Sequence, residues 1–276
     1  MPRLAKALLA AATAMIAMPA AGQDMASEDS RPELALMGTI PIYWGEAAGF
    51  DAILAGEGEM HWARAEIERD WRIAPLDYLS AEELAGHRFL MLAQPRGFTA
   101  EENVALDGWV RGGGKLLLFA DPLMTGHSQF GLGDRRRPQD TVLLSPILAH
   151  WGLELHFDEI GDDAGSPAFG GFPLPVEWPG RFALRDEGER DCSLESDSVV
   201  ASCRIGEGYA LLVADAAILN LEGAPDEAEA AFYRLLSTAM GMAREGCRSP
   251  EIWNDYPAES QSPACEASMR DEVNGL

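Results

Sequence analysis

Three carboxylates come directly after apolar segments that have the character of buried strands. Asp121 and Asp215 each end such a segment, and Glu46 follows the first one in the chain. In an open parallel sheet, ligands bind outside the carboxyl ends of the strands. We therefore expect these side chains at one edge of a sheet, where they either line a site or cap helices and brace turns.

The segment that follows Asp121 is the most basic part of the chain. It holds His127 and the triplet Arg135-Arg136-Arg137. Such a cluster binds an anion, docks a partner or only neutralises the surrounding acid. The leading hypothesis is a ligand- or partner-binding edge made of six residues: Asp121, His127, Arg135, Arg136, Arg137 and Asp215.

Two other classes of protein stay open. A hydrolase acting on an envelope glycan or ester would use Glu46 and Asp121 as its acid and base, which requires both carboxylates in one cleft. A stand-alone small-molecule-binding protein would need no partner at all.

Several catalytic signatures are missing from the sequence. The run from Gly112 to Lys115 lacks the spacing of a phosphate loop. The run from Gly126 to Gly131 places its second glycine one residue late for a nucleophile elbow. The five histidines show no metal-binding spacing. The sequence therefore favours a non-enzymatic protein without a metal or a cofactor.

The first 22 residues predict export. Arg3 and Lys6 precede an apolar run from Ala7 to Met18, and small residues follow up to Gly22. This order is typical of a secretory signal peptide. The alternative is an uncleaved membrane anchor, but the run is shorter than the roughly 20 residues that span a bilayer. We expect cleavage near Gly22 and a periplasmic or secreted protein.

The four cysteines agree with an oxidising compartment. An even number of cysteines in an exported chain predicts disulfides. Four cysteines allow three pairings, and proximity favours Cys192 with Cys203 and Cys247 with Cys265.

The net charge is −24, from 45 acidic and 21 basic residues. That charge repels nucleic acids and anionic lipid surfaces, so neither is expected as a partner. After signal cleavage we also expect no stable membrane insertion, because no second apolar stretch is long enough to span a bilayer.

Patterns along the chain predict alternating strands and helices. Apolar runs predict strands at 34–44, 71–79, 88–93, 115–120, 153–157 and 209–214. Capping residues, proline and apolar periodicity predict helices near 59–70, after Ser80, after Thr99, from Ser145 and over 226–240. The unit from 88 to 120 reads as strand, helix, glycine stop and strand, which predicts a parallel βαβ crossover.

These elements predict four parts after the signal peptide. Residues 23–33 form a polar leader, and residues 34–243 form an α/β domain. Within that domain, residues 164–208 form an antiparallel insertion that extends the sheet. Residues 244–276 form an acidic, proline-containing tail.

The chain resembles a known family in the same region. From Arg88 it reads Phe-Leu-Met-Leu-Ala-Gln-Pro, then Glu-Glu-Asn-Val-Ala-Leu-Asp-Gly-Trp-Val, then Gly-Gly-Lys-Leu-Leu-Leu-Phe-Ala-Asp-Pro. This pattern resembles the exported auxiliary domain of ABC-type transport systems, a group that includes the gliding-motility auxiliary proteins. The segments 145–153 and 208–215 resemble the same family, so the likeness runs from about Leu36 to Gly241.

The resemblance implies a flavodoxin-like, class I glutamine amidotransferase-like fold, a three-layer sandwich around a mainly parallel sheet. It also implies an ABC permease/ATPase pair, or another envelope protein, as partner. True amidotransferases carry a nucleophilic cysteine at a strand-to-helix elbow, whereas every cysteine here follows residue 191. Amidotransferase chemistry is therefore not expected.

Overall fold

A computed structural model describes residues 29–46, 60–131, 133–157, 167–186, 191–221, 223 and 225–241. The predicted signal peptide, residues 23–28 of the leader and the tail from 244 lie outside the described residues. The chain from Arg31 onward forms one unit, and all the elements below belong to it.

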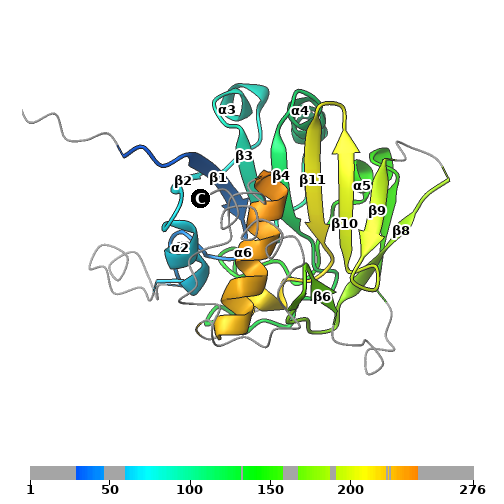
Figure 1. The fold of residues 1–276 in the computed structure, drawn as a ribbon. Helices are drawn as coiled ribbons and strands as arrows, with labels where there is room; N and C mark the ends of the chain where they lie inside the picture. The colour runs from blue at the N-terminus through cyan, green and yellow to red at the C-terminus, as the bar shows by residue number, and fades with distance from the viewer. Residues whose placement is uncertain are drawn as a thin grey trace, which may run out of the picture. The chain divides into compact units, whose positions relative to one another are not determined.

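The main sheet has five parallel strands and two antiparallel ones (Figure 1). Its order is β2-β1-β3-β4-β11-β10-β9, and the strands up to β11 are parallel. Taken in chain order, the parallel strands lie as 2-1-3-4-5, which is the flavodoxin-like arrangement. The bounds are β1 Glu33–Gly38, β2 Arg72–Pro75, β3 Phe89–Ala93, β4 Lys115–Phe119, β9 Cys192–Glu195, β10 Val200–Ile205 and β11 Gly208–Val213.

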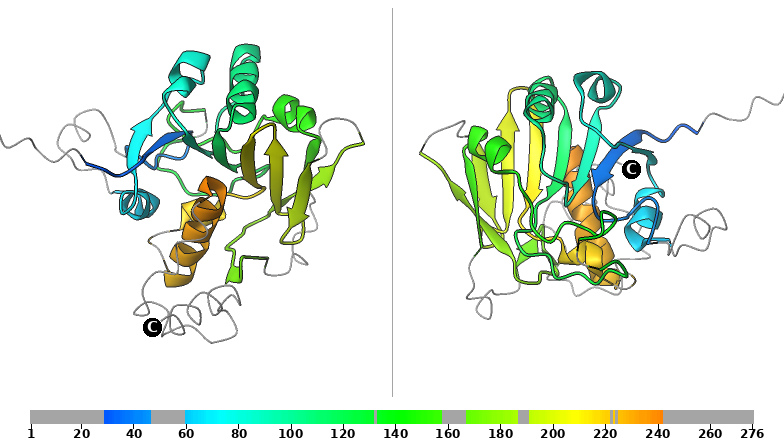
Figure 2. Two further views of the ribbon diagram at one scale, coloured as in Figure 1. Left: turned by 45° about the horizontal axis from the view of Figure 1, so that its top comes forward. Right: turned by 180° about the vertical axis from the view of Figure 1, so that it is seen from behind.

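Helices cover both faces of this sheet, so the unit has three layers (Figure 2). One face packs against α2 (Trp62–Ile67) and α6 (Asp226–Met240). The opposite face packs against α3 (Ala81–Ala85), α4 (Ala100–Arg111) and α5 (Ser145–His150). The predicted fold class is therefore confirmed.

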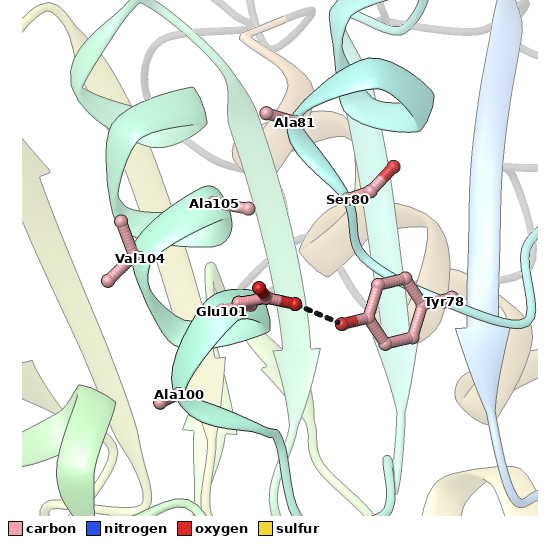
Figure 3. A pocket seen from close by; sticks show the side chains of 7 residues that line it. All are labelled: Tyr78, Ser80, Ala81, Ala100, Glu101, Val104 and Ala105. Atoms are coloured by element: carbon pink, nitrogen blue, oxygen red, sulfur yellow. Dashed lines mark hydrogen bonds between the residues drawn. The ribbon is translucent and has the colours of Figure 1, made fainter.

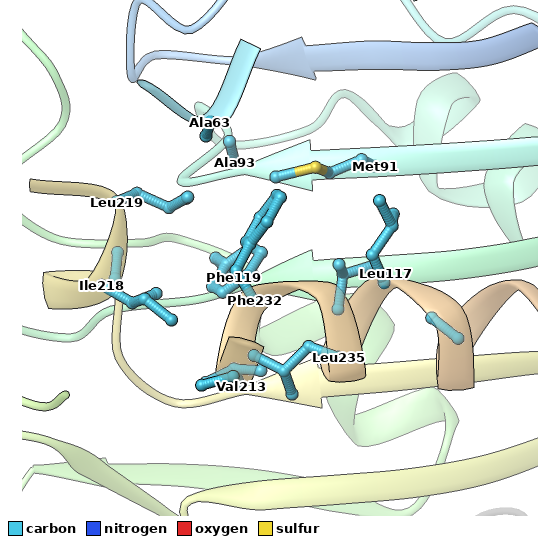
Figure 4. Close-up of a cluster of buried hydrophobic side chains, with 14 of the residues drawn as sticks. Ala63, Met91, Ala93, Leu117, Phe119, Val213, Ile218, Leu219, Phe232 and Leu235 are labelled. Carbon is cyan, nitrogen blue, oxygen red and sulfur yellow. The ribbon is translucent and has the colours of Figure 1, made fainter. Parts of the chain in front are cut away.

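The central strands are buried on both faces because their side chains alternate between the two cores. On the α6 face, Leu117 and Phe119 of β4 pack with Phe232 and Leu235 (Figure 4). Leu116 and Leu118 point to the other core. A nearly continuous apolar run is the sequence pattern that such a strand requires.

Capping residues and glycines determine where the helices begin and end. Thr99 caps α4 in a reciprocal capping box with Glu102, and Gly241 closes α6 with φ 73°. The predicted glycine stop ends α4. Gly112 keeps φ −77°, and the left-handed turn falls on Gly113, with φ 105°.

Several predicted elements are shorter in the structure. The strand expected over 34–44 ends at Gly38, because the Thr39 amide turns to donate to the Ala93 and Gln94 carbonyls. The strand expected over 71–79 covers only 72–75, and the helix expected over 59–70 covers 62–67.

The antiparallel part is divided between the main sheet and two small sheets. Strands β9 and β10 extend the main sheet, as predicted. Strand β5 (Leu153–Phe157) instead pairs with β8 (Gly180–Leu184), and β6 (Ala168–Phe169) pairs with β7 (Phe172–Pro173).

A disulfide joins Cys192 of β9 to Cys203 of β10, two residues that lie directly opposite in the register. This confirms the first predicted pairing. The second, between Cys247 and Cys265, lies outside the described residues.

Candidate functional site

Asp121 and Asp215 lie side by side at the carboxyl edge of the sheet. Each comes two residues after the end of its strand, and the parallel strands β4 and β11 pair Phe119 with Val213. Both side chains are buried, with 1% exposure each.

All four carboxylate oxygens of the pair accept backbone N–H groups. Asp121 accepts from Leu123 at 2.8 Å and from Ala216 at 3.1 Å. Asp215 accepts from Ala217 at 2.7 Å and from Glu177 at 3.0 Å. The two aspartates therefore hold the loops that leave β4 and β11 and the segment before β8.

Burial raises the pKa of both aspartates. It raises the pKa of Asp121 to about 6, and the nearby Glu177 charge adds to the shift while the N–H groups oppose it. For Asp215, burial and the adjacent Asp121 charge raise the pKa to about 8. Two carboxylates this close cannot both ionise freely, so the pair retains a proton near neutral pH.

Gln94 joins the loops after β3 and β4. It follows β3 directly, is fully buried and adopts φ 49°. Its side-chain oxygen accepts from the Asp121 amide at 2.8 Å, and its Nε2 donates to the carbonyls of Asp121 and Gln139. Its own carbonyl accepts from the Thr39 hydroxyl. The sequence analysis missed this residue, because an isolated glutamine after a strand carries no distinctive signal.

We call the segment between β4 and α5 the β4–α5 loop (residues 120–144, green in Figure 2). Its first and last residues lie next to each other. The Val142 amide donates to the Asp121 carbonyl at 3.1 Å, and the Met124 amide donates to the Asp140 carbonyl at 2.9 Å. These two hydrogen bonds hold the start and the end of the β4–α5 loop together.

The body of the β4–α5 loop contacts segments that follow three other strands. The Gln139 amide donates to the Thr39 hydroxyl, after β1. The Gln139 carbonyl accepts from Gln94, after β3. Gly126 lies against Asn220 after β11, so closely that an added Cβ would come within 2.6 Å of the Asn220 side chain. The loop therefore lies across the carboxyl edge, where a flavodoxin-like fold positions its ligands.

The arginine triplet divides into two paired residues and one without a described partner. Arg136 forms an ion pair with Asp134 at 2.7 Å and stacks over Phe130. Arg137 pairs with Asp140 at 3.1 Å. No described residue forms an ion pair with Arg135, which is exposed. Two of the three charges thus neutralise acid within their own loop.

Glu46 and His127 lie near this loop but not at the aspartate pair. The Glu46 carboxylate accepts from the Gln129 amide at 2.9 Å, so it braces the loop next to the exposed His127. Asp121 is bound by other groups, and no hydrogen bond among the described residues joins it to Glu46. No contact therefore favours the hydrolase hypothesis, which requires these two carboxylates to act together.

A second buried carboxylate lies at the start of α4. Glu102 receives two hydrogen bonds from the Arg96 guanidinium, at 2.7 and 2.9 Å, and one each from the Thr99 and Leu79 amides. Burial alone would raise the pKa of Glu102, but these donors lower it to about 2. The capping-box pattern pointed to Glu102, whereas nothing in the sequence pointed to Arg96 as its partner.

A groove of about 470 Å³ lies between the first turns of α3 and α4. Figure 3 shows the lining side chains on the two helices and on the segment that precedes α3. Its lining is mainly apolar and consists of Tyr78, Ser80, Ala81, Ala100, Glu101, Val104 and Ala105. The sequence analysis did not predict it, because the groove arises from the packing of two helices.

Two features are absent from the described part of the chain. No group of three or more histidine, cysteine or acidic side chains there could hold a metal ion. No helix in that part is long and apolar enough to cross a bilayer.

The strand order and layers define an α/β protein with a flavodoxin-like sheet. A family model described as an "ABC-type uncharacterized transport system" matches residues 52–169. This match relates the chain to auxiliary proteins associated with ABC-type transport and confirms the resemblance noted in the sequence. The matched region includes Asp121, the β4–α5 loop and the α3–α4 groove. No curated protein matches the chain.

Solved structures with partial similarity include enzymes and smaller proteins. An exo-β-1,4-mannosidase from an Opitutaceae bacterium is 14% identical, with a TM-score of 0.39 over 73% of this chain and 32% of that one. A cytoplasmic protein from Salmonella typhimurium is 12% identical, with a TM-score of 0.41 over 75% and 98%. A ThuA-like protein from Bacteroides uniformis is 9% identical, with a TM-score of 0.39 over 78% and 96%. This chain spans about a third of the mannosidase, and at these identities and scores no activity is transferred.

Proposed function

We propose that this protein is a non-enzymatic, periplasmic accessory protein of an ABC-type transport or envelope system. It binds a ligand or partner at the carboxyl edge of its sheet. The family match supports the association with transport. The predicted signal peptide and the disulfide support the export of the protein.

The observation that carries the proposal is the path of the β4–α5 loop. It is tied to the segments after β1, β3 and β11, and it exposes His127 and Arg135 to solvent. On a chain with a net charge of −24, an arginine without a described counter-charge is a natural contact for an acidic ligand or surface.

The remaining members of the site have supporting roles in this proposal. Asp121 and Asp215 hold the loops through backbone N–H groups, and their buried side chains do not contact the partner. Arg136 and Arg137 shape the loop through their pairs with Asp134 and Asp140.

An affinity capture from cross-linked envelopes tests the proposal. The tagged mature protein is compared with a variant that carries His127→Ala and Arg135→Ala, and recovered proteins are identified by mass spectrometry. We expect the unmodified protein to recover a transport permease or its ATPase and the double variant to lose most of that recovery.

Arg88→Ala is the matched control, because Arg88 is also exposed but lies at the amino end of β3. Its recovery should equal that of the unmodified protein. Absence of any transport component from the unmodified capture contradicts the accessory role. Equal recovery by the double variant removes the β4–α5 loop from the contact.

A further inference from the structure

The groove between α3 and α4 exposes apolar side chains to solvent, whereas the solvent-facing side of a helix normally carries polar residues. Val104 is 74% exposed although it is a β-branched apolar residue on the outer side of α4. Tyr78 is 37% exposed on the opposite wall (Figure 3). Ala81, Ala100 and Ala105 leave room between the walls.

One carboxylate lines this apolar groove, and two more lie beside it in the chain. Glu101 lines it and accepts only a long hydrogen bond, 3.4 Å, from the Tyr78 hydroxyl. Glu82 and Glu83 lie on the first turn of α3, next to the lining residue Ala81, and both are exposed. In the described part of the chain, no arginine, lysine or histidine forms an ion pair with any of these three residues.

Arg96, which lies close to Tyr78, does not pair with these carboxylates. Arg96 approaches the Tyr78 ring, but its guanidinium is held by the buried Glu102. Among the described residues, therefore, these exposed carboxylates have no ion-pair partner.

The helix N-termini beside the groove do not make it an anion site. At the start of α4, the Thr99 hydroxyl accepts from the Glu102 amide and the Glu102 carboxylate accepts from the Thr99 amide. At the start of α3, the Ser80 hydroxyl accepts from the Glu83 amide. The exposed carboxylates repel phosphate groups and anionic lipids. The groove thus fits an occupant that is apolar on one side and positively charged at its margin.

We propose that the α3–α4 groove docks an amphipathic, lysine- or arginine-containing segment of a partner protein. One or two aliphatic side chains of that segment lie between Tyr78 and Val104, and its cations face Glu101, Glu82 and Glu83. This inference rests on the proposed accessory role, since it concerns how such a partner is held. It uses a different surface from the β4–α5 loop.

A defined peptide tests the groove without any knowledge of the partner. The probe is a 12-residue peptide with three Leu-Lys-Lys-Leu repeats, and its control has glutamate in place of lysine. Binding to the purified mature protein is measured by calorimetry and mapped by backbone amide shifts in NMR spectra. We expect the cationic peptide to shift the amides of Tyr78, Ala81, Ala100 and Val104, and the acidic peptide to shift none of them.

Matched variants separate the apolar and charged contributions. Val104→Ser should weaken binding about tenfold, and Glu101→Gln should weaken it about threefold, with a smaller effect of added salt. Leu184→Ser and Glu207→Gln alter exposed residues outside the groove and should leave the affinity unchanged. Circular dichroism establishes that each variant is folded.

Several results overturn the inference. These are no binding at millimolar peptide, amide shifts elsewhere, equal weakening by the control variants, or equal binding of the acidic peptide. A concentration-dependent dimer that Val104→Ser abolishes would also overturn it, because a second copy would then occupy the groove. The peptide experiment does not involve His127 or Arg135, so its failure leaves the envelope capture as an independent test of the proposed function.

Discussion

Gln94 shows how a single residue organises the carboxyl edge. Its left-handed backbone conformation costs about 1 kcal/mol or more for a residue other than glycine. Three side-chain hydrogen bonds, to the amide and carbonyl of Asp121 and the carbonyl of Gln139, offset that cost. The strained backbone of Gln94 therefore lies where the loops after β3 and β4 are joined by hydrogen bonds.

Replacing Gln94 by alanine should lower the free energy of unfolding by about 3 kcal/mol. Alanine retains the backbone strain but removes all three hydrogen bonds and leaves the Asp121 amide without its acceptor. Urea unfolding measures the loss. Gln139→Ala is the control, because Gln139 contributes only its backbone to the network, and a loss as large as that of Gln94→Ala would contradict this account.

The aspartate pair predicts a pH dependence with a definite sign. The pKa of Asp215 is raised to about 8 in the folded protein from an ordinary value of 3.8. Between these values the folded state keeps a proton that the unfolded state has lost. The resulting stability is present below pH 4 and is lost as the pH rises through about 8.

In the unmodified protein, the unfolding free energy should fall between pH 4 and pH 8. In Asp215→Asn this decrease should be smaller by roughly 2–5 kcal/mol. Thermal or urea unfolding at several pH values measures this slope. Asp134→Asn is the control, since Asp134 is a partly exposed aspartate whose pKa is held at about 2 by hydrogen bonds from Arg136. The same slope in the Asp215 variant and the unmodified protein would show that Asp215 does not carry the shift.

At the scale of elements, the start of α4 ties three segments together. Glu102 caps α4, binds the amide of Leu79 before α3 and holds Arg96 in the loop after β3. Because the Arg96 side chain is partly exposed, removing Glu102 costs mainly the acceptor of the Thr99 and Leu79 amides and the packing of a buried side chain, which is more than the loss of an exposed ion pair.

Glu102→Ala should lower the unfolding free energy by about 3–5 kcal/mol, while Glu101→Ala on the same turn should change it by less than about 0.5 kcal/mol. The pKa of Glu102 is lowered from an ordinary value of 4.5 to about 2 in the folded protein. The stability that Glu102 supplies should therefore be lost as the pH falls from 4.5 through about 2. Chemical unfolding of both variants checks the first expectation. Equal effects of the two substitutions would mean that burial of Glu102 has no energetic role.

The edge strand β9 is held to the sheet by the disulfide as well as by its pairing with β10. Replacing both Cys192 and Cys203 by alanine should lower the unfolding free energy by about 3 kcal/mol, the loop-closure value for a short loop. Differential scanning calorimetry of the variant measures this change. An unchanged melting temperature would show that β9 and β10 hold together without the cross-link.

Elements with local signals were predictable from the sequence, whereas their distant partners were not. The Thr99 capping box and the apolar periodicity of residues 226–240 identified α4 and α6, because these signals act within a few residues. The strand at 153–157 was also predicted, but its pairing with β8 depends on a chain segment about 25 residues away in sequence. The sequence contains no local rule that selects such a partner.

The candidate site shows the same division. Strand ends predicted that Asp121 and Asp215 lie at one edge, because parallel strands end together. Their burial and their backbone partners depend on the paths of the β4–α5 loop and the segment before β8, which no short motif describes. Gln94 and Arg96 were missed for the same reason.

At the scale of the whole molecule, a strongly acidic chain presents a carboxyl edge crossed by its most basic loop. The net charge of −24 disfavours contact with nucleic acids and anionic surfaces, while the exposed Arg135 is a positive group at one place. The family match covers this loop and the two helices that form the groove. In the account proposed here, these two surfaces hold the protein on its transport system.

Site-specific photo-cross-linking in cells tests the central claim most directly. A photoreactive amino acid replaces Arg135 in one variant and Arg88, at the opposite end of the strands, in a second variant. The account predicts a covalent adduct with a transport permease or its associated proteins from position 135 and none from position 88. Adducts from both positions in equal yield, or from neither, would contradict a partner-binding role for the carboxyl edge.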